Sequence, residues 1–134
     1  MYGRVFDWYT LEGPFVVKHD GRYFCFYSGG CWQTDTYGVD YVVADSVLGP
    51  WSDAGAEAGP RLLRTVPGRV LGPGHCSVVP GPDGDSRWLA YHAWSAEQDA
   101  RRLCIDELTF STGGPRSPGP TWTPQTAPAR SSAR

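Results

Sequence analysis

An internal repeat constrains the fold of this chain more than any other feature. Residues 12–28 and 75–92 each begin with a polar residue, enter a short β-branched run, turn at Asp-Gly and leave through an aromatic run. Glu12 and His75 lie 63 positions apart, and the aspartates of the two Asp-Gly turns are separated by the same 63 positions. Two independent landmarks therefore give one period, which indicates a repeat architecture.

The first unit is predicted to form an antiparallel meander. Strands are expected at residues 15–17, 22–27 and 37–44. Asp20-Gly21 should form a two-residue hairpin turn, because both positions tolerate a positive φ angle. Residues 61–64 are expected to add a short fourth strand.

The second unit repeats this pattern. Its strands are expected at residues 77–79, 88–91 and 103–108, with a turn at Asp83-Gly84 equivalent to the first. Thr121-Trp-Thr is expected to add one edge strand. Beyond residue 111 the composition shifts to Pro, Gly, Ser and Thr, which is typical of irregular structure.

The second strand of each unit is apolar on both faces: Tyr23-Phe-Cys-Phe-Tyr in one and Trp88-Leu-Ala-Tyr in the other. Such runs indicate sheets that are covered on both sides. Short antiparallel sheets that repeat and pack face to face are the building plan of a β-propeller. A generic β-sandwich is the alternative. The period exceeds the ~40–50 residues of common interaction-type blades, which leaves room for functional loops.

Composition agrees with an all-β fold and excludes several partners. The chain has 17 Gly, 12 Pro, six Trp and seven Tyr, and turn formers and aromatics are enriched in β-proteins. Lys plus Arg is 12 and Asp plus Glu is 14, and no basic stripe is visible. This argues against a nucleic-acid partner. No apolar run approaches the ~20 residues of a membrane span. No secretory signal is visible, so we expect a cytoplasmic protein if Met1 is the true start.

The four cysteines show no metal-binding spacing. Cys25, Cys31, Cys76 and Cys104 form no CxxC pair, which argues against a zinc knuckle. We interpret them as small buried hydrophobes, and the sequence leaves a disulfide open.

Four motifs resemble one enzyme family in order and in spacing. They are Thr10-Leu-Glu-Gly-Pro, the run from Asp20 to Gly30, Val43-Ala-Asp-Ser-Val-Leu-Gly-Pro-Trp, and Gly72-Pro-Gly-His followed by Tyr91-His92. With these motifs, residues 8–125 resemble glycoside hydrolase family 43, which includes β-xylosidases, α-L-arabinofuranosidases and endo-arabinanases. The resemblance implies a five-bladed β-propeller acting on xylose- or arabinose-containing plant polysaccharides or oligosaccharides.

The chain is long enough for about two of the five blades. Residues 1–125 are expected to form a partial propeller domain with repeats at about 12–65 and 75–125, and residues 126–134 a disordered tail. A complete propeller at this period needs about 300 residues. The sequence is therefore expected to be a fragment or one piece of a split protein, which lacks its N-terminal blades and is prone to self-association.

The resemblance implies an inverting mechanism with three carboxylates, of which this chain keeps one. Glu12 occupies the family's Glu-Gly-Pro motif and is expected to be the general acid that protonates the leaving oxygen. The general base and an aspartate that tunes the acid belong to blades that the chain lacks. An acid alone completes half of an inverting displacement, so the isolated chain is expected to be inactive. Read without the family, Glu12 is better interpreted as a surface carboxylate at a strand entry, although its place at the start of a repeat, matched by His75, favours a shared central cavity.

Three further residues are expected to bind substrate. His75 resembles the family's axial histidine, which holds water or a cation such as calcium; the alternative is a structural histidine. Of the pair Arg101-Arg102, we expect Arg102 to reach the sugar, because a guanidinium fork suits vicinal hydroxyls; a solvated pair is the alternative. Trp32 is expected to stack on a sugar ring or to cover the edge of the barrel. No cofactor is predicted with certainty.

Two other classes of function stay open. The chain is alternatively a non-catalytic carbohydrate-binding remnant that uses Trp32, or a structural, protein-interaction fragment of a propeller. Saccharide affinity without turnover would favour the first of these.

Overall fold

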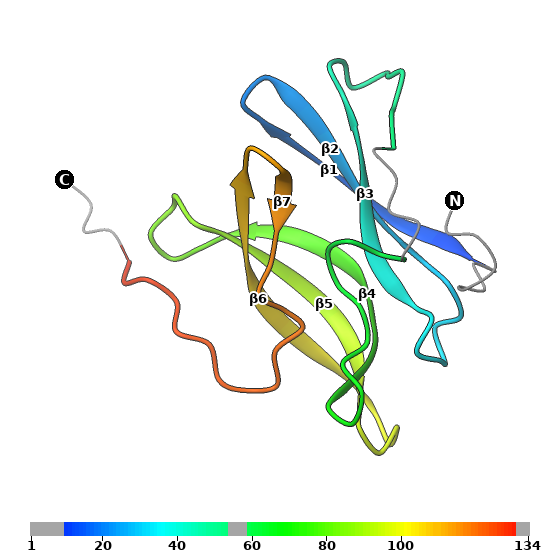
Figure 1. Cartoon of the computed structure of the whole chain (residues 1–134). Helices are drawn as coiled ribbons and strands as arrows, with labels where there is room; N and C mark the ends of the chain where they lie inside the picture. Colours follow the sequence, from blue (N-terminus) through cyan, green and yellow to red (C-terminus); the bar gives the residue numbers. More distant parts are fainter. Residues whose placement is uncertain (1–9, 54–58, 131–134) are drawn as a thin grey trace.

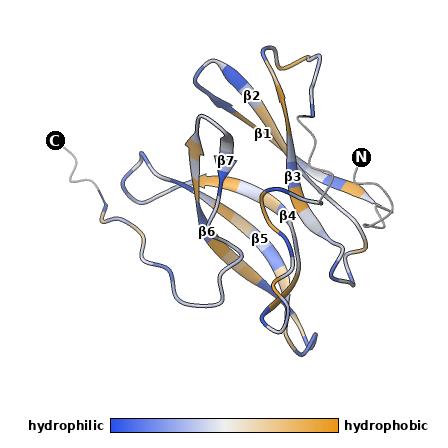
Figure 2. Cartoon of the chain, in the orientation of Figure 1, coloured by the Kyte–Doolittle hydropathy of each residue, from blue (hydrophilic) through white to orange (hydrophobic). Residues whose placement is uncertain are grey.

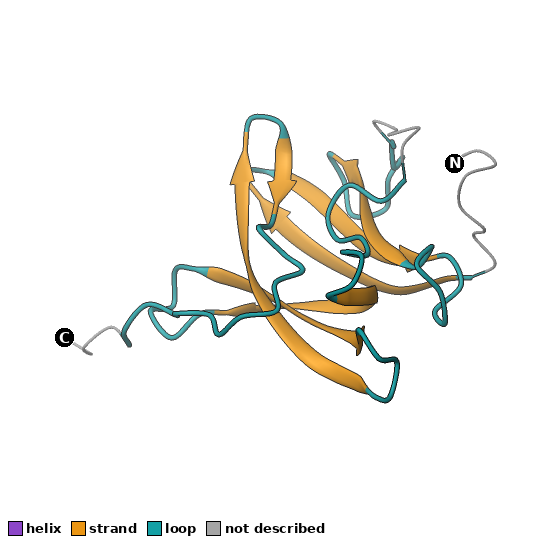
Figure 3. Ribbon diagram, turned by 60° about the horizontal axis from the view of Figure 1, so that its bottom comes forward, coloured by secondary structure: helices purple, strands orange, loops and turns teal. Residues whose placement is uncertain are grey.

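The computed structural model describes residues 10–53 and 59–130, which form two antiparallel β-sheets without a helix (Figures 1 and 3). The first sheet has the order β1 (Leu11–His19), β2 (Arg22–Gly29) and β3 (Gly38–Ala44). The second has the order β4 (Val70–Pro80), β5 (Arg87–Ser95), β6 (Arg101–Ser111) and β7 (Gly114–Arg116). Each sheet is a meander of consecutive strands, as the repeat predicts.

The first hairpin turn has the predicted geometry. Asp20 and Gly21 have φ angles of 47° and 79°, and His19 pairs with Arg22 on either side of them. Two consecutive positive φ angles are the signature of a type I′ turn, whose twist matches that of the flanking strands.

The second turn lies in the equivalent place but differs in type. Pro80 pairs with Arg87, so a six-residue loop replaces the two-residue turn. Within it, Oδ1 of Asp83 accepts hydrogen bonds from the N–H of Asp85 at 3.2 Å and from the N–H and Oγ of Ser86 at 3.0 and 2.7 Å. The prediction of an equivalent Asp83-Gly84 hairpin turn is therefore wrong in detail, because the side chain of Asp83 organises a longer loop.

The predicted short strand at residues 61–64 is not formed. Only an isolated bridge joins Leu63 to Val39. Pro60 lacks an N–H for a ladder, and Arg61 turns inward, where its Nε lies 2.6 Å from Oδ1 of the buried Asp40. Backbone hydrogen bonds at this one bridge, together with the side chain of Arg61, therefore hold the segment to β3 without forming a strand.

The predicted edge strand at residues 121–123 is also wrong. The edge is formed instead by β7, which pairs with β6. The N–H of Thr121 donates to Oδ2 of Asp106 at 3.1 Å and is not available for a strand ladder. Residues 126–130 carry no regular secondary structure, and the rest of the predicted tail, like residues 1–9 of the predicted domain, lies outside the described residues.

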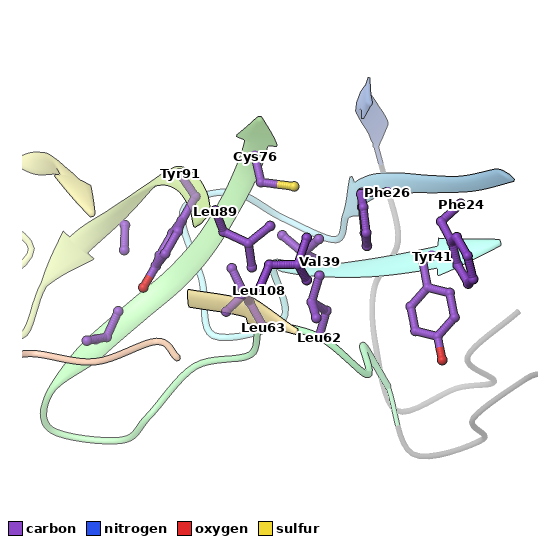
Figure 4. Packing of buried hydrophobic residues seen from close by; sticks show 12 residues of the cluster. Phe24, Phe26, Val39, Tyr41, Leu62, Leu63, Cys76, Leu89, Tyr91 and Leu108 are labelled. Atoms are coloured by element: carbon purple, nitrogen blue, oxygen red, sulfur yellow. The ribbon is translucent and has the colours of Figure 1, made fainter. Parts of the chain in front are cut away.

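The main hydrophobic core lies between the two sheets. Figure 4 shows Phe26 and Val39 of the first sheet on the side that meets Leu89 and Leu108 of the second. The hydropathy colouring in Figure 2 places hydrophobic residues along the strands and hydrophilic residues mainly in turns and loops. Packing of this kind, in which each sheet covers one face of the next, fits the prediction of consecutive blades.

Phe24 and Trp88 are both buried, with 7% and 6% of their surface exposed. Phe24 belongs to the core between the sheets, as predicted. Trp88 is not part of that core: its Nε1 donates to Oγ of Ser86 at 3.1 Å, within the loop that precedes its own strand. Trp88 is therefore buried, but by its own hairpin rather than by the neighbouring sheet.

All four cysteines are free thiols. Cys76 is buried in the core, and this burial raises the pKa of its thiol to about 12. A thiol with such a pKa is inert at neutral pH, which agrees with the interpretation of Cys76 as a hydrophobic residue. In residues 10–53 and 59–130 no helix is long and apolar enough to cross a membrane.

Candidate functional site

Two strand irregularities bring Glu12 and His75 together. The pairing of β1 with β2 shifts between Glu12 and Phe15, and the pairing of β4 with β5 shifts again after Gly74. At the second irregularity His75 adopts a φ angle of 55°. Its Nδ1 lies 4.0 Å from Oε2 of Glu12. Bulges re-aim side chains, and here they direct the two residues that begin the repeats toward each other.

The backbone of His75 is fixed by the first sheet. Its N–H donates to the hydroxyl of Ser28 at 2.7 Å, and Ser28 is fully buried in β2. A hydrogen bond between β4 and β2 therefore holds the unusual conformation of His75 and with it the position of its ring.

Tyr37 holds the carboxylate of Glu12. Its hydroxyl donates to Oε1 of Glu12 at 2.6 Å, and its side chain is fully buried. The ring fits because residue 74 is glycine: a Cβ at Gly74 would lie 1.9 Å from the ring of Tyr37. Burial, together with the hydrogen bond to Glu12 and its negative charge, raises the pKa of the Tyr37 phenol. Tyr37 therefore stays protonated and remains a donor to Glu12.

His92 completes the cluster as a neutral imidazole. Its ring stacks on Tyr37 at 5.9 Å between centroids with an interplanar angle of 7°, and lies 6.2 Å from the ring of His75. Its buried Nδ1 has no hydrogen-bond partner among the described residues. Burial, then the positive charges of Arg101 and His75, lower the pKa of His92. We refer to Glu12, Tyr37, His75 and His92 as the Glu12 cluster.

The Glu12 cluster can move a proton at a fixed position. Tyr37 occupies Oε1 of Glu12, while Oε2 faces His75, and 35% of the Glu12 side chain is exposed. One carboxyl oxygen is therefore held and the other is open to solvent or a substrate. Such an arrangement suits a general acid or base, because the proton-transferring group must first lie within hydrogen-bonding reach of the substrate and only then needs a suitable pKa.

Trp32 lies at the rim between the two sheets. Its ring stacks on Trp94 at 6.1 Å, and the guanidinium of Arg101 lies 4.8 Å from its centroid. The indole N–H of Trp94 donates to the carbonyl of Trp32 at 2.9 Å. Trp32 thus ties the loop after β2 to β5 and β6, and 37% of its surface remains exposed.

Arg102 is not part of the Glu12 cluster. In β6, Arg101 pairs with Trp94 and Arg102 with Ala93, so the two arginines point to opposite faces of the sheet. Arg101 shares a face with His92 and helps to lower the pKa of its imidazole. Arg102 lies 3.4 Å from the carboxylate of Asp99. The structure therefore associates Arg101, rather than Arg102, with Glu12.

Sequence reasoning missed Tyr37 and named His92 only as part of a family motif. The hydrogen bond from Tyr37 to Glu12 joins residues 25 positions apart, and nothing local to Tyr37 signals it. For Arg101 the sequence does hold a signal. In a hairpin the register between two strands determines which residues share a face, so the spacing between Arg101 and Trp94 predicts that Arg101 lies on the face of His92.

The described residues do not form a cation cage. No group of three His, Cys, Asp or Glu side chains within residues 10–53 and 59–130 could hold a metal ion. Calcium takes six to eight oxygen ligands, and beside His75 the carboxylate of Glu12 is the charged oxygen donor that the structure places nearby. These residues alone do not fit calcium, and a cation at His75 stays a prediction.

Comparison with known proteins identifies the family of this chain. Residues 3–115 match the model of the family described as glycosyl hydrolases family 43. The β-D-galactofuranosidase xynD of Aspergillus niger is 35% identical over 107 residues, which are 78% of this chain and 30% of that protein.

Solved structures show the same relation. A thermostable family-43 glycoside hydrolase superposes with a TM-score of 0.75 at 35% identity, covering 90% of this chain and 39% of the other. An α-L-arabinanase of Cellvibrio cellulosa in complex with arabinohexaose gives 0.63 at 26% identity, covering 80% and 36%. The neighbours are five-bladed β-propellers of which this chain covers about 40%, which confirms the predicted partial propeller. The chain belongs to glycosyl hydrolases family 43 and spans well under half the length of these relatives.

Proposed function

We propose that this chain supplies the general acid of a glycosidase that hydrolyses O-glycosidic bonds in xylose- or arabinose-containing plant polysaccharides or oligosaccharides. The reaction is an inverting displacement, in which Glu12 protonates the leaving glycosidic oxygen. Arabinohexaose is bound by a solved relative, and β-D-galactofuranosidase is the name of another; a pentose or furanose chain is therefore the substrate class that we assign.

One observation carries this proposal: the hydrogen bond of 2.6 Å from the buried Tyr37 to Oε1 of Glu12. A surface carboxylate without a function needs no buried donor. Here Tyr37 fixes the carboxyl plane while Oε2 stays open on the side of His75. A fixed acid with one open oxygen meets the geometric requirement for protonating a bound substrate.

The reaction needs a second carboxylate. In an inverting glycosidase the acid and the base lie about 6.5–9.5 Å apart, which leaves room for the attacking water. Because the chain spans 39% of a solved relative, we propose that the base and the carboxylate that tunes Glu12 come from blades outside this chain.

Other residues are assigned as substrate contacts. His75, whose Nδ1 lies 4.0 Å from Oε2 of Glu12, is assigned to contact the substrate directly or through water. Trp32 offers an exposed indole at the rim, where a further sugar unit can stack. Arg101 holds Trp32 in place. Arg102 contacts saccharide only at a separate place, described below.

The test is Glu12→Gln in a protein completed by fusion to the N-terminal blades of a full-length relative. Hydrolysis of substrates with poor leaving groups should fall by about 100–10,000-fold, and hydrolysis of aryl glycosides by much less, because an activated phenol needs little acid assistance. The pH–rate profile of Glu12→Gln should also lack the fall in rate at alkaline pH, because that fall reports the loss of the proton from Glu12.

Asp85→Asn is the matched control, because Asp85 lies exposed in the loop between β4 and β5. It should leave both classes of substrate unchanged. Unaltered hydrolysis of unactivated substrates by Glu12→Gln would overturn the assignment of the acid.

A further inference from the structure

A cavity lies away from the Glu12 cluster. Its volume is about 370 Å³, and it is formed by the turn before β4, the turn between β5 and β6, and the segment that follows β7. Arg69, Glu97, Arg102 and Trp122 line it. We refer to it as the Trp122 pocket. Arg102 reaches it because it points to the face of β6 opposite to that of Arg101.

A buried carboxylate anchors the base of the Trp122 pocket. Asp106 is fully buried, and its Oδ1 and Oδ2 accept from the hydroxyl and N–H of Thr121 at 2.7 and 3.1 Å. Tyr91 donates to the same Oδ2 at 2.5 Å. The residue after Thr121 is Trp122, 55% of whose surface is exposed. An aromatic side chain is therefore presented to solvent on a fixed backbone.

The polar groups around this indole have unused hydrogen-bonding capacity. The guanidinium of Arg69 lies 5.4 Å from the centroid of Trp122. The side chain of Arg102 is 62% exposed, and its guanidinium lies 3.4 Å from both carboxylate oxygens of Asp99. Together with the carboxylate of Glu97, these groups offer donors and an acceptor beside an aromatic surface.

We propose that the Trp122 pocket binds one unit of a neutral saccharide chain. Trp122 stacks on the apolar face of the sugar ring, while the planar fork of Arg102 and the carboxylate of Glu97 bind its hydroxyls. The choice of a saccharide as ligand rests on the substrate class of the proposed function. The pocket holds a polysaccharide on the enzyme without taking part in the cleavage.

The experiment is a titration of the full 134-residue chain, labelled with ¹⁵N, with xylohexaose and with arabinohexaose. The indole N–H signal of Trp122 is identified as the one that Trp122→Ala removes. One of the two saccharides should shift this signal in a saturable way. In the variants, binding is followed by the backbone amide signals of Arg102 and Thr121, which line the same pocket. Trp122→Ala should weaken binding by about tenfold or more, the equivalent of a lost aromatic contact, and Trp122→Phe should restore part of it.

Two variants separate this pocket from the catalytic site. Glu12→Gln should leave the shift of the Trp122 signal unchanged, and Trp32→Ala should do the same. No shift with either saccharide, or a loss of binding in Trp32→Ala but not in Trp122→Ala, would overturn the proposal. If the fusion with the N-terminal blades were inactive but saccharide still shifted the Trp122 signal, the proposed function would be contradicted and the Trp122 pocket would not.

Discussion

Tyr37 shows how a single side chain turns a strand-entry glutamate into a positioned acid. It reaches Glu12 across the first sheet and stacks on His92 of the second, so one phenol links both sheets at the candidate site. Its fully buried position makes this link rigid. The Glu-Gly-Pro motif was enough to single out Glu12, but its partner came from the tertiary structure.

A double-mutant cycle tests the bond between Tyr37 and Glu12. Tyr37→Phe and Glu12→Ala, each of which removes one partner of the hydrogen bond, should give alone and together a coupling free energy of unfolding of about 1 kcal/mol or more. Urea denaturation of the four proteins measures it. Strictly additive effects would show that the two side chains do not interact.

His92 should make stability depend on pH. Its pKa in the folded chain lies below the ordinary 6.5, through burial and then the charges of Arg101 and His75, against a smaller opposing effect of Glu12. The unfolded chain therefore binds a proton more readily, and the free energy of unfolding should fall as the pH drops below about 6.5.

Denaturation curves at about pH 7.5 and about pH 5.5 measure this effect. His92→Gln should reduce the loss of stability at the lower pH, whereas His19→Gln, at the other end of the first sheet, should not. An equal loss in wild type and in His92→Gln would contradict the account of His92.

The sequence predicts a strand where a local pattern of apolar residues determines it. It predicts a turn where the residue types themselves favour the turn conformation. Apolar runs located β2 and β5, and Asp20-Gly21 gave the correct turn. The predictions failed for residues 61–64 and 121–123, where buried carboxylates distant in sequence capture the polar groups of the segment. Nothing local to either segment reveals those partners.

A matched pair of leucines tests the placement of the core. Leu89 of β5 is fully buried, and Leu103 of the neighbouring β6 is 81% exposed. Leu89→Ala should lower the free energy of unfolding by about 2–5 kcal/mol, and Leu103→Ala should change it by no more than about 0.5 kcal/mol. Thermal or urea denaturation of both variants compares them. Equal effects would show that β6 does not expose this face.

The two sheets together leave outward faces uncovered. Leu103 and Ile105 of β6 are 81% and 48% exposed, and Val79 of β4, at 39%, lies on the same face by strand register. On the first sheet Val16 is 43% exposed. Blades of a propeller cover such faces for one another. We propose that further blades, or a second copy of the chain, cover them here.

The repeat and the family motifs predicted this architecture, because period and motif order are properties of the sequence itself. The faces that Arg101 and Arg102 occupy depend on register with β5. The Trp122 pocket depends on an anchor, Asp106, that lies 15 positions from Thr121. Neither feature could be predicted without the three-dimensional structure.

The measurement that decides the account is the hydrolysis of aryl xylosides and arabinofuranosides by the chain alone and by the chain fused to the N-terminal blades of a full-length relative. The chain alone should show no turnover above background, because an acid without a base cannot complete an inverting displacement. The fusion should restore turnover that Glu12→Gln then lowers for poor leaving groups. Turnover by the unfused 134-residue chain would contradict the account, because this chain or a second copy of it would then supply both carboxylates.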